Sequence, residues 1–373
     1  MAADPRLFTP GPLTTSPTVK EATLHDLGSR DQRFIDTVRR IRARLVELCG
    51  ADPAEYAAIP VQGSGTFGVE AVVGSVLPPG GKLLTVENGV YGARIAQIAG
   101  VLRIPVERLV GPEHLPVDAA RVAAALAADP GITHVAVVHS ETTTGLVNPL
   151  PPVAAAVRAQ GRSLIVDAMS SFGGLPLDLR ALGADFVVSS PNKCLQGLPG
   201  FAFVIGRRSV LAASRGQARS LSLDLPAQLE GLEASGQFRF TPPVQALLAL
   251  DRALDELDAE GGIPARAARY RQNHQTLVEG MSRLGFRTFL APEHQGPIIT
   301  SFHYPAHPRF RFQDFYERLG RRGFVIYPGK LSQADCFRIG TIGHLFPADV
   351  QALVAAIAAV LGELEIPVPL ERA

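Results

Sequence analysis

Short apolar runs recur along most of this chain, and Ala-rich segments with helical spacing lie between many of them. Seven of these runs have the composition of strands: 57–61, 82–86, 104–108, 134–138, 163–166, 186–189 and 201–205. Helical spacing is found at 69–76, 91–100, 117–128 and 153–160. Strands that alternate with helices are typical of βαβ units, so we expect an α/β fold with a mainly parallel, seven-stranded sheet. The last run follows a connection too short for a helical crossover, which predicts an antiparallel return strand.

The chain is long enough for two domains, because 373 residues exceed what one hydrophobic core usually serves. A long amphipathic helix is predicted over 243–260, and a second helix with Arg266, Arg269 and Tyr270 follows the break at Gly261 and Gly262. Beyond it, helices at 273–284, 313–319 and 348–361 mix with strands at 298–302, 325–327 and 337–339. This pattern indicates a smaller α+β C-terminal domain. We therefore divide the chain into an N-terminal segment 1–15, a large domain 16–260 and a small domain 261–373.

Composition and charge exclude several classes of protein. Hydrophobic residues at 46% and charged residues at 19% favour a folded globular chain over long disordered regions. A formal net charge of +1 provides no global field for nucleic acid or an anionic membrane. Cys49, Cys194 and Cys336 are widely spaced, which argues against a metal site or a disulfide framework and favours a reducing cytoplasm. Without an apolar leader or a membrane-length apolar run, the sequence predicts a soluble intracellular protein.

A glycine-rich loop lies between the first predicted strand and its helix. Gly63 to Gly68 reads G-x-G-x-x-G, and Glu87 ends the next strand. Glycines let the backbone approach a phosphate, and the amides of the helix N-terminus bind its charge together with the hydroxyls of Ser64 and Thr66. The pattern fits a dinucleotide, a single phosphate monoester, or a helix start that binds nothing.

An aspartate and a lysine follow two other predicted strands. Asp167 comes directly after 163–166, and Lys193 follows 186–189 through a short turn. Both lie at carboxyl ends of strands, where open α/β sheets bind ligands. A lysine amine and a carboxylate that holds a pyridine nitrogen protonated are what pyridoxal phosphate requires. Taken singly, Lys193 reads as a solvated loop residue and Asp167 as a helix cap.

Further candidates follow other strands or lie in the C-terminal part. Tyr91 is placed to stack on a cofactor ring or to pack on the sheet. Thr142–Thr144 offer hydroxyls for a ligand or for capping. Arg338 lies inside an apolar strand, so it needs an anionic partner, either a substrate or a structural carboxylate. Arg239 and Thr241 precede the long helix and either complete an anion site or belong to a surface loop.

Segments spread over nearly the whole chain carry a more specific signal. They are 9–15, 62–68, 88–94, 139–145, 167–174, 192–194, 199–205, 219–225, 297–300 and 323–330. Together they resemble the 2-aminoethylphosphonate:pyruvate transaminases, a branch of the class V aminotransferases. Two motifs, Asp-Ala-Met-Ser-Ser-Phe-Gly-Gly at 167–174 and Tyr-Pro-Gly-Lys at 327–330, resemble those of the phosphonate branch rather than those of the wider class.

The resemblance implies a fold-type I homodimer that uses pyridoxal phosphate, with active sites near the subunit interface and segment 1–15 lining them. Lys193 would hold the cofactor covalently and Asp167 would pair with its ring nitrogen. The other implied cofactor contacts are Ser64, Gly65 and Thr66 at the phosphate, Tyr91 at the ring, Thr142 or Thr143 at the phenolic oxygen, and Arg239 and Thr241, the latter reaching the neighbouring subunit's phosphate. Arg338 would bind the substrate anion, and Arg30 is a second candidate because a dianion favours more than one cation.

The implied reaction moves the amino group of 2-aminoethylphosphonate to pyruvate and gives phosphonoacetaldehyde and L-alanine. Within the class, the alternatives are other amino donors, of the alanine:glyoxylate or serine type or a hydroxylated aminophosphonate. A nicotinamide-dependent oxidoreductase is a remote alternative that rests on Gly63 to Gly68 and Glu87. A regulator that only binds the cofactor is a further alternative, but the chain lacks a basic patch for DNA.

Overall fold

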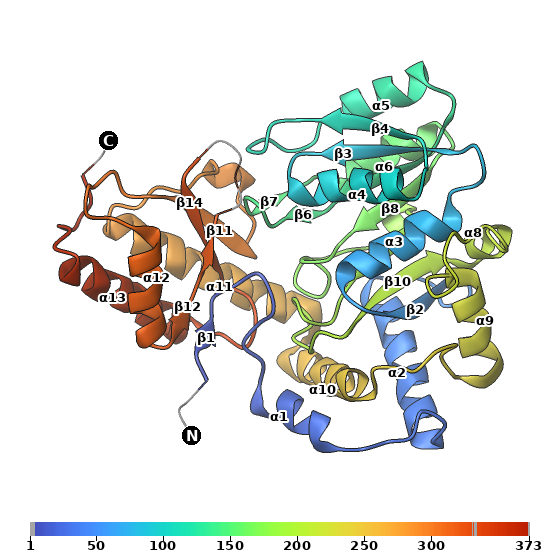
Figure 1. Ribbon diagram of the computed structural model, residues 1–373, viewed down its shortest axis with the longest axis horizontal. Helices are drawn as coiled ribbons and strands as arrows, with labels where there is room; N and C mark the ends of the chain where they lie inside the picture. Colours follow the sequence, from blue (N-terminus) through green and yellow to red (C-terminus); the bar gives the residue numbers. More distant parts are fainter. Residues whose placement is uncertain (1–3, 330, 332–333, 372–373) are drawn as a thin grey trace.

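A mixed sheet of seven strands forms the centre of the larger lobe in the computed structural model, which describes residues 4–329, 331 and 334–371 (Figure 1). In spatial order the strands are β2 (Tyr56–Gln62), β10 (Phe201–Arg207), β9 (Phe186–Ser189), β8 (Ser163–Asp167), β5 (Ile132–Val138), β3 (Lys82–Glu87) and β4 (Val106–Val110). In this sheet β10 is antiparallel to β2 and β9, and the other pairs are parallel. The predicted α/β fold and the return strand are therefore confirmed.

Helices cover both faces of this sheet. On one face α3 (Gly65–Val76) packs beside α4 (Val90–Val101), and on the other α5 (Ala119–Ala128) packs beside α6 (Leu150–Ala159) (Figure 1). Both faces of the central strands are consequently buried, and Val135, Val137 and Val166 have no exposed surface. The apolar runs of the sequence thus become strands without an alternating polar face. The order of these elements brings the carboxyl ends of the parallel strands to one edge.

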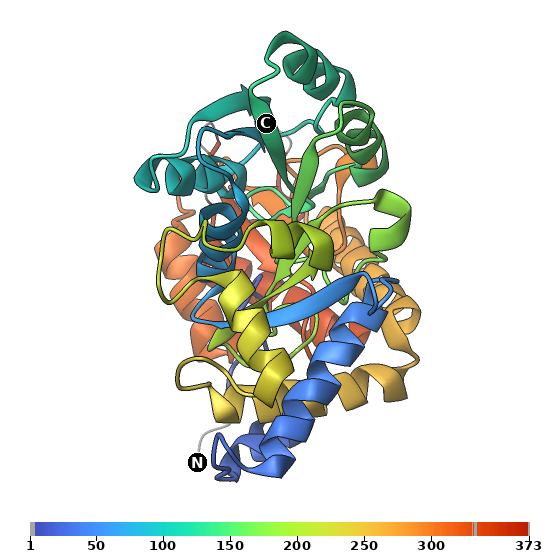
Figure 2. The same ribbon diagram turned by 90° about the vertical axis from the view of Figure 1, so that its right-hand side faces the viewer.

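Further helices complete the large lobe. The unpredicted helix α2 (Gln32–Leu48) and α9 (Leu225–Ser235) lie over β2 (Figure 2). The remaining elements are α1 (Pro17–Glu21), η1 (Ala22–Leu24), β6 (Ser140–Glu141), β7 (Leu146–Val147), α7 (Leu179–Leu182), α8 (Arg208–Ala213) and α10 (Val244–Glu260). Asp224 caps α9 by accepting a hydrogen bond from the Ala227 amide at 3.0 Å.

The helix α11 (Gly262–Arg283) connects the two lobes (Figure 1). The two helices predicted over this stretch are one continuous helix, since no glycine or proline interrupts 265–279. The smaller lobe contains η2 (Pro292–His294), β11 (Ile299–His303), α12 (Phe312–Arg321), β12 (Phe324–Val325), β13 (Tyr327–Pro328), β14 (Cys336–Gly340) and α13 (Pro347–Glu363). Strand β14 lies between β11 and β13, antiparallel to both.

The N-terminal segment joins the smaller lobe rather than the larger one. Strand β1 (Arg6–Leu7) pairs in parallel with β12, and Phe8 belongs to the hydrophobic cluster around Phe302 and Phe337. A separate, larger cluster surrounds the seven-stranded sheet. The chain past Phe8 then runs between the lobes, which places Pro10 and Gly11 at the site described below (Figure 1).

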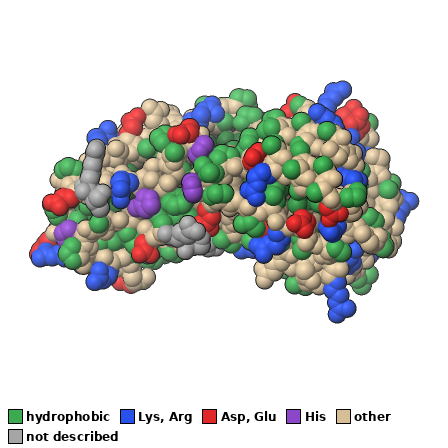
Figure 3. All heavy atoms as spheres, turned by 90° about the horizontal axis from the view of Figure 1, so that it is seen from above, with side chains coloured by type: hydrophobic (Ala, Val, Ile, Leu, Met, Phe, Trp, Pro, Cys, Tyr) green, Lys and Arg blue, Asp and Glu red, His purple; other side chains and the backbone are tan. Residues whose placement is uncertain are grey.

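The surface seen from above carries basic and acidic side chains interspersed over both lobes (Figure 3). Among the described residues, no helix combines the length and apolar character needed to cross a membrane. Lys330, the last residue of the 323–330 segment, lies outside the described residues.

Candidate active site

A cavity of about 430 Å³ opens at the carboxyl ends of the parallel strands and reaches the smaller lobe. It brings together residues that are far apart in the sequence. The predicted site residues that line it are Ser64, Gly65, Thr66, Tyr91, Thr142, Asp167, Lys193 and Arg338. Other residues on its wall include Pro10, Gly11, Arg94, Ser140, Met169, Asn192 and Tyr327.

The loop after β2 forms a cradle at the N-terminus of α3. Gly63 has φ of +113°, a conformation that favours glycine, and Ser64 occupies the N-cap without using its hydroxyl as a cap. The first amides of a helix have no partner within it, so those of Gly65 and Thr66 are available at the cavity. A Cβ on Gly65 would overlap the Met169 sulfur. The local sequence therefore provides the backbone amides and small residues that an anion needs.

Asp167 ends β8 as a buried carboxylate. Its side chain accepts a hydrogen bond from the Met169 amide at 2.9 Å, and the residue is 5% exposed. Burial raises the pKa of Asp167 to about 6, although the Met169 amide and the charge of Arg94 oppose this. No ion pair to Asp167 is present among the described residues. The carboxylate is thus poised to accept a cationic N–H from a ligand.

Lys193 presents its amine to the same cavity. Burial lowers the pKa of this amine to about 8, because removal from water disfavours the ammonium form. The amine lies against the N-terminal segment, and a Cβ on Gly11 would overlap Lys193 Nζ. Gly11 also has φ of +124°, a backbone conformation that residues other than glycine rarely adopt. A partly neutral amine under a glycine cover is suited to nucleophilic attack.

Tyr91 lies in the first turn of α4, and two residues without an assigned role hold it there. The Arg94 guanidinium is 4.9 Å from the centroid of the Tyr91 ring. The Tyr91 amide donates to Glu141 Oε2 at 3.2 Å. Burial raises the pKa of Glu141 to about 6, against the hydrogen bonds from Thr143. Arg94 lies one helical turn after Tyr91 in the sequence, and this spacing could have predicted the contact between the two side chains.

The three successive threonines do not share one environment. Thr142 lines the cavity, whereas the Thr143 hydroxyl donates to Glu141 Oε1 at 2.6 Å and accepts from the Val90 amide. The Thr144 hydroxyl accepts from the Leu146 amide at 3.2 Å. Thr142 is therefore the one of the three that borders the cavity.

Arg338 is a buried cation on the wall opposite the large sheet. The residue is 1% exposed, and its guanidinium donates to the carbonyls of Thr142 at 2.7 Å and Pro328 at 3.0 Å. Burial lowers its pKa. Among the described residues it forms no ion pair with a carboxylate. Its two hydrogen-bonded carbonyl partners carry no net charge, so the buried guanidinium retains the capacity to bind an anion from solution.

Several predicted residues do not line the cavity of this chain. Arg30 is exposed on the surface. Arg239 donates to the Leu221 carbonyl at 3.0 Å, and the carbonyl of Thr241 accepts from Gln62 at 3.1 Å. Glu87, on which the nicotinamide alternative depended, is buried and hydrogen-bonded to Thr85 and Arg108 instead.

Comparison with known proteins identifies the family. Residues 18–333 match the family Aminotransferase class-V. The fold agrees, since the chain superposes on the alanine–glyoxylate aminotransferase of Nostoc sp. with a TM-score of 0.90 at 25% identity, covering 97% of this chain and 96% of that one. Pyridoxamine–pyruvate aminotransferase from Mesorhizobium loti gives a TM-score of 0.88 at 26% identity over 98% and 94% of the two chains. The chain therefore belongs to the class V aminotransferases.

Its sequence relatives are more specific. The chain is 53% identical to the 2-aminoethylphosphonate–pyruvate transaminase of Syntrophobacter fumaroxidans over 351 residues, 94% of each protein. It is 52% identical to the enzyme of the same name from Salmonella typhimurium over 353 residues, 94% of this chain and 96% of that protein. The similarity to the phosphonate branch that the sequence motifs predicted is confirmed.

The cofactor of this class is pyridoxal 5′-phosphate, and the cavity fits it. The α3 N-terminus offers amides that have no partner in the part of the chain that the structure describes, Asp167 offers a buried carboxylate for a ring N–H, and Lys193 offers an amine. These three features lie around one cavity, as the sequence pattern required.

Proposed function

We propose that this protein is a transaminase that moves the amino group of 2-aminoethylphosphonate to pyruvate, giving phosphonoacetaldehyde and L-alanine. The observation that carries the chemistry is the single cavity lined by Lys193, Asp167, the α3 N-terminus and Arg338. The choice of amino donor rests on the relatives, which carry this activity in their names at 52–53% identity over 94% of this chain.

The binding residues have distinct tasks. The amides of Gly65 and Thr66, with the Ser64 and Thr66 hydroxyls, would hold the cofactor phosphate. Tyr91 would cover one face of the cofactor ring. The Arg94 guanidinium, which lies over the Tyr91 side chain, would hold Tyr91 in position. Thr142 is favoured over Thr143 for the phenolic oxygen, because Thr143 donates its hydroxyl to Glu141.

The proton-handling residues are Asp167 and Lys193. When bound, the cofactor supplies an aldehyde that captures primary amines and a protonated ring that accepts the electron pair of the adjacent C–H bond. The Asp167 carboxylate would keep the proton on the ring nitrogen, because an ion pair in this buried site favours both charges. Lys193 Nζ would take the proton from the amine-bearing carbon and return it to the acceptor, since its lowered pKa of about 8 leaves part of it neutral near neutral pH. Pro10 and Gly11 would exclude water from this amine.

Arg338 would bind the anionic group of each substrate. Its planar fork matches both the phosphonate of the donor and the carboxylate of pyruvate. Two half-reactions at one site predict ping-pong kinetics. Arg30 is exposed, so a contribution to the phosphonate would require approach from outside the cavity of this chain.

The test combines a spectrum with a donor screen. The purified protein should develop a visible absorbance with pyridoxal phosphate, and Lys193→Ala should lose both this absorbance and turnover. Lys20→Ala, at a largely exposed lysine paired with Asp4, is the matched control and should retain both. With pyruvate as acceptor, 2-aminoethylphosphonate should be used in preference to serine and a hydroxylated aminophosphonate. Alanine with pyruvate gives no net reaction, so alanine is tested with glyoxylate as acceptor, where turnover should be lower than with 2-aminoethylphosphonate and pyruvate. A coloured, active Lys193→Ala protein would refute the role of the lysine, and preference for a carboxylate amino acid would refute the donor.

We further propose that the chain forms a homodimer with its active sites near the interface. Phe67, Leu221 and Phe240 are exposed by 50%, 76% and 44%. They lie on the segments around the cradle, and Arg239 and Thr241 belong to the same surface. An exposed apolar patch of this kind favours association. Light scattering should give a dimer, and Thr241→Ala should weaken cofactor binding if this residue reaches the partner's phosphate.

Two further expectations remain proposals. We assign residues 16–260 to the cofactor-binding domain and 261–373 to the small domain, with 1–15 as a segment that lines the site; the two separate hydrophobic clusters support this division. We also propose a cytoplasmic location. Cys49, Cys194 and Cys336 are buried, unpaired thiols, which a reducing compartment preserves.

A further inference from the structure

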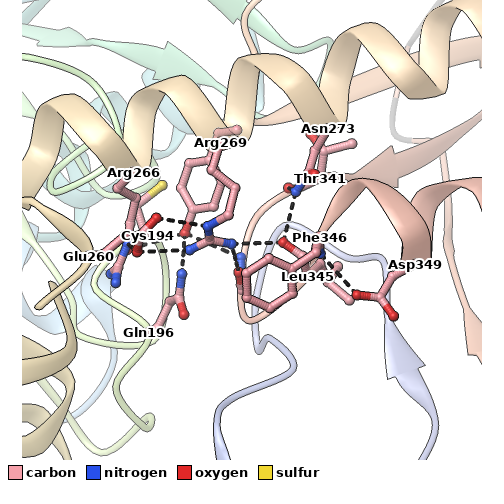
Figure 4. Close-up of polar contacts among 12 residues, drawn as sticks. Cys194, Gln196, Glu260, Arg266, Arg269, Asn273, Thr341, Leu345, Phe346 and Asp349 are labelled. Atoms are coloured by element: carbon pink, nitrogen blue, oxygen red, sulfur yellow. Dashed lines mark hydrogen bonds and ion pairs between the residues drawn. The ribbon is translucent and has the colours of Figure 1, made fainter.

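A polar cluster along α11 and at the end of α10 lies behind the active site and outside its lining. We call Glu260, the last residue of α10, and Arg266, Arg269, Tyr270 and Asn273 of α11 the α11 cluster (Figure 4). Tyr270 and Asn273 have no exposed surface, and Arg266 is 1% exposed. Burial of so many polar groups is costly unless each has a partner, so their partners indicate what the cluster holds in place.

One side of the cluster holds the turn that follows Lys193. Arg266 Nη1 donates to the Cys194 carbonyl at 3.0 Å, and the Tyr270 hydroxyl donates to the same carbonyl at 3.4 Å. Gln196 Nε2 donates to the Tyr270 oxygen at 2.7 Å. Gln196 has φ of +63°, a left-handed conformation that is unfavourable for this residue type and requires support from its surroundings. The backbone amide of Gln196 also donates to the Lys193 carbonyl at 2.8 Å, which closes the turn.

The other side of the cluster holds the segment that follows Arg338. Strand β14 ends at Gly340. Beyond it, the side-chain amide of Asn273 donates to the carbonyls of Thr341 at 3.1 Å and Leu345 at 2.9 Å. Arg269 Nη1 donates to the carbonyls of Gly343 at 2.8 Å and Leu345 at 2.7 Å. In Figure 4, Arg269 and Asn273 project from the helix toward this segment, and Arg266 projects from the same helix toward Cys194.

Glu260 and Tyr270 couple the two sides. Glu260 accepts from Arg266 Nε and from Arg269 Nε, each at 2.8 Å. Burial opposes its charge, but the hydrogen bonds and charges of the two arginines outweigh burial and lower its pKa. The Tyr270 hydroxyl also accepts from the Gly343 amide at 3.3 Å, so one oxygen contacts both segments. A displacement of either segment would therefore disturb the bonds to the other.

We propose that the α11 cluster is a positioning element that fixes the Lys193 amine relative to the Arg338 guanidinium. This inference rests on the proposed function, in which the amine-bearing carbon and the anionic group of a substrate must reach these two side chains at once. The residues of the cluster are not among those that line the cavity. They act through backbone segments, and small errors in such alignment have large effects on rate.

Two variants distinguish the shared contacts of the cluster from those to the Arg338 side alone. Tyr270→Phe keeps the ring and removes the hydroxyl that bonds to the Lys193 turn and to the Gly343 amide. We expect it to move the midpoint of the pH titration of the visible absorbance by about half a pH unit and to lower kcat roughly tenfold. Asn273→Ala removes only contacts to the Arg338 side. We expect it to raise KM for pyruvate roughly tenfold and to leave the absorbance midpoint unchanged.

Arg271→Ala is the control, because Arg271 is exposed on the same helix. If Asn273→Ala does not fold, Asn273→Ser is the substitute with the same expectation. Variants that lose only melting temperature, with midpoint, kcat and KM equal to those of Arg271→Ala, would overturn the inference, because the cluster would then contribute stability alone. A wild-type protein without absorbance or turnover would instead refute the proposed function, so the two failures are distinguishable.

Discussion

The substitution Asp167→Asn should stabilise the protein without its cofactor and weaken cofactor binding. Burial raises the pKa of this carboxyl from 3.8 to about 6, despite the Met169 amide and Arg94. Each pKa unit corresponds to about 1.4 kcal/mol, so the charged carboxylate destabilises the unloaded fold by about 3 kcal/mol at pH 8. Asparagine has nearly the same shape without the charge, and it removes this penalty.

The sign of the pH dependence follows from the raised pKa. The folded-state value lies above that of the unfolded chain, so the penalty is absent below pH 3.8 and complete above a pH of about 6. Near pH 5 about half of the full penalty is present. The advantage of the variant over the wild type should therefore grow as the pH rises from 4 to 8. A smaller contribution comes from Glu141, because the charge of Asp167 helps to raise its pKa.

Urea unfolding of both unloaded proteins at pH 5 and pH 8, followed by circular dichroism, measures this difference. The cofactor should reverse the order, because the ring N–H pairs with aspartate and not with asparagine. Asp118→Asn is the matched control, since Asp118 is the exposed N-cap of α5, where asparagine caps as well as aspartate. An advantage of the Asp167 variant that is equal at both pH values, or a variant less stable than wild type at pH 8, would refute the reasoning.

Three other predictions concern the cavity wall. Gly11→Ala should slow the appearance of visible absorbance roughly tenfold, because its Cβ overlaps Lys193 Nζ and its backbone favours glycine; uptake at the wild-type rate would contradict this. Arg338→Lys should raise KM for pyruvate roughly 10- to 100-fold with the absorbance unchanged, since the charge stays and the planar fork is lost; steady-state kinetics decide, and an unchanged KM counts against anion binding there. The rate of cofactor attachment should rise with pH and level off above about 8, because the neutral Lys193 amine attacks and burial lowers its pKa; a rate that is flat between pH 6 and pH 9 would exclude this.

The sequence predicted the seven-stranded sheet well because its central strands are buried on both faces and end in glycine or polar turns. Strand β9 matches the prediction at both ends, whereas β4 begins at Val106 instead of residue 104. The Ile104 amide donates to the Ala99 carbonyl, so this apolar residue closes the end of α4 rather than opening the strand. The predicted strand 325–327 is divided between β12 and β13, which belong to different sheets.

Helix α2 was not predicted, although its buried apolar residues recur at helical spacing after the N-cap Asp31. What local spacing does not indicate is how this helix pairs with α10. Arg40 lies 2.5 Å from Asp251, and Arg44 lies 2.8 Å from Asp255, both on α10. The sequence places five arginines in this helix without indicating which acidic residues they meet. Such pairing depends on the packing of two helices that are far apart in the chain.

The candidate site was predictable where motifs directly follow strands. It was not predictable where side chains from distant segments contact each other. Lys193 and Asp167 follow from strand ends, and their shared cavity agrees with that reasoning. The separate environments of Thr142 and Thr143 depend on Glu141, a buried carboxylate whose position no local pattern indicates. The contact of Arg266 with the Lys193 turn likewise joins segments from different parts of the fold.

The pairing of β1 with β12 has a consequence for biosynthesis. Arg6 and Leu7 leave the ribosome long before their partners, Phe324 and Val325, because most of the large lobe and the linking helix lie between them in the sequence. The glycine that covers the reactive amine therefore remains without its anchoring strand until the smaller lobe has been made, although domains of growing chains generally fold from the N-terminus onward. Catalytic competence should consequently wait for the synthesis of β12, even when the seven-stranded sheet is already complete.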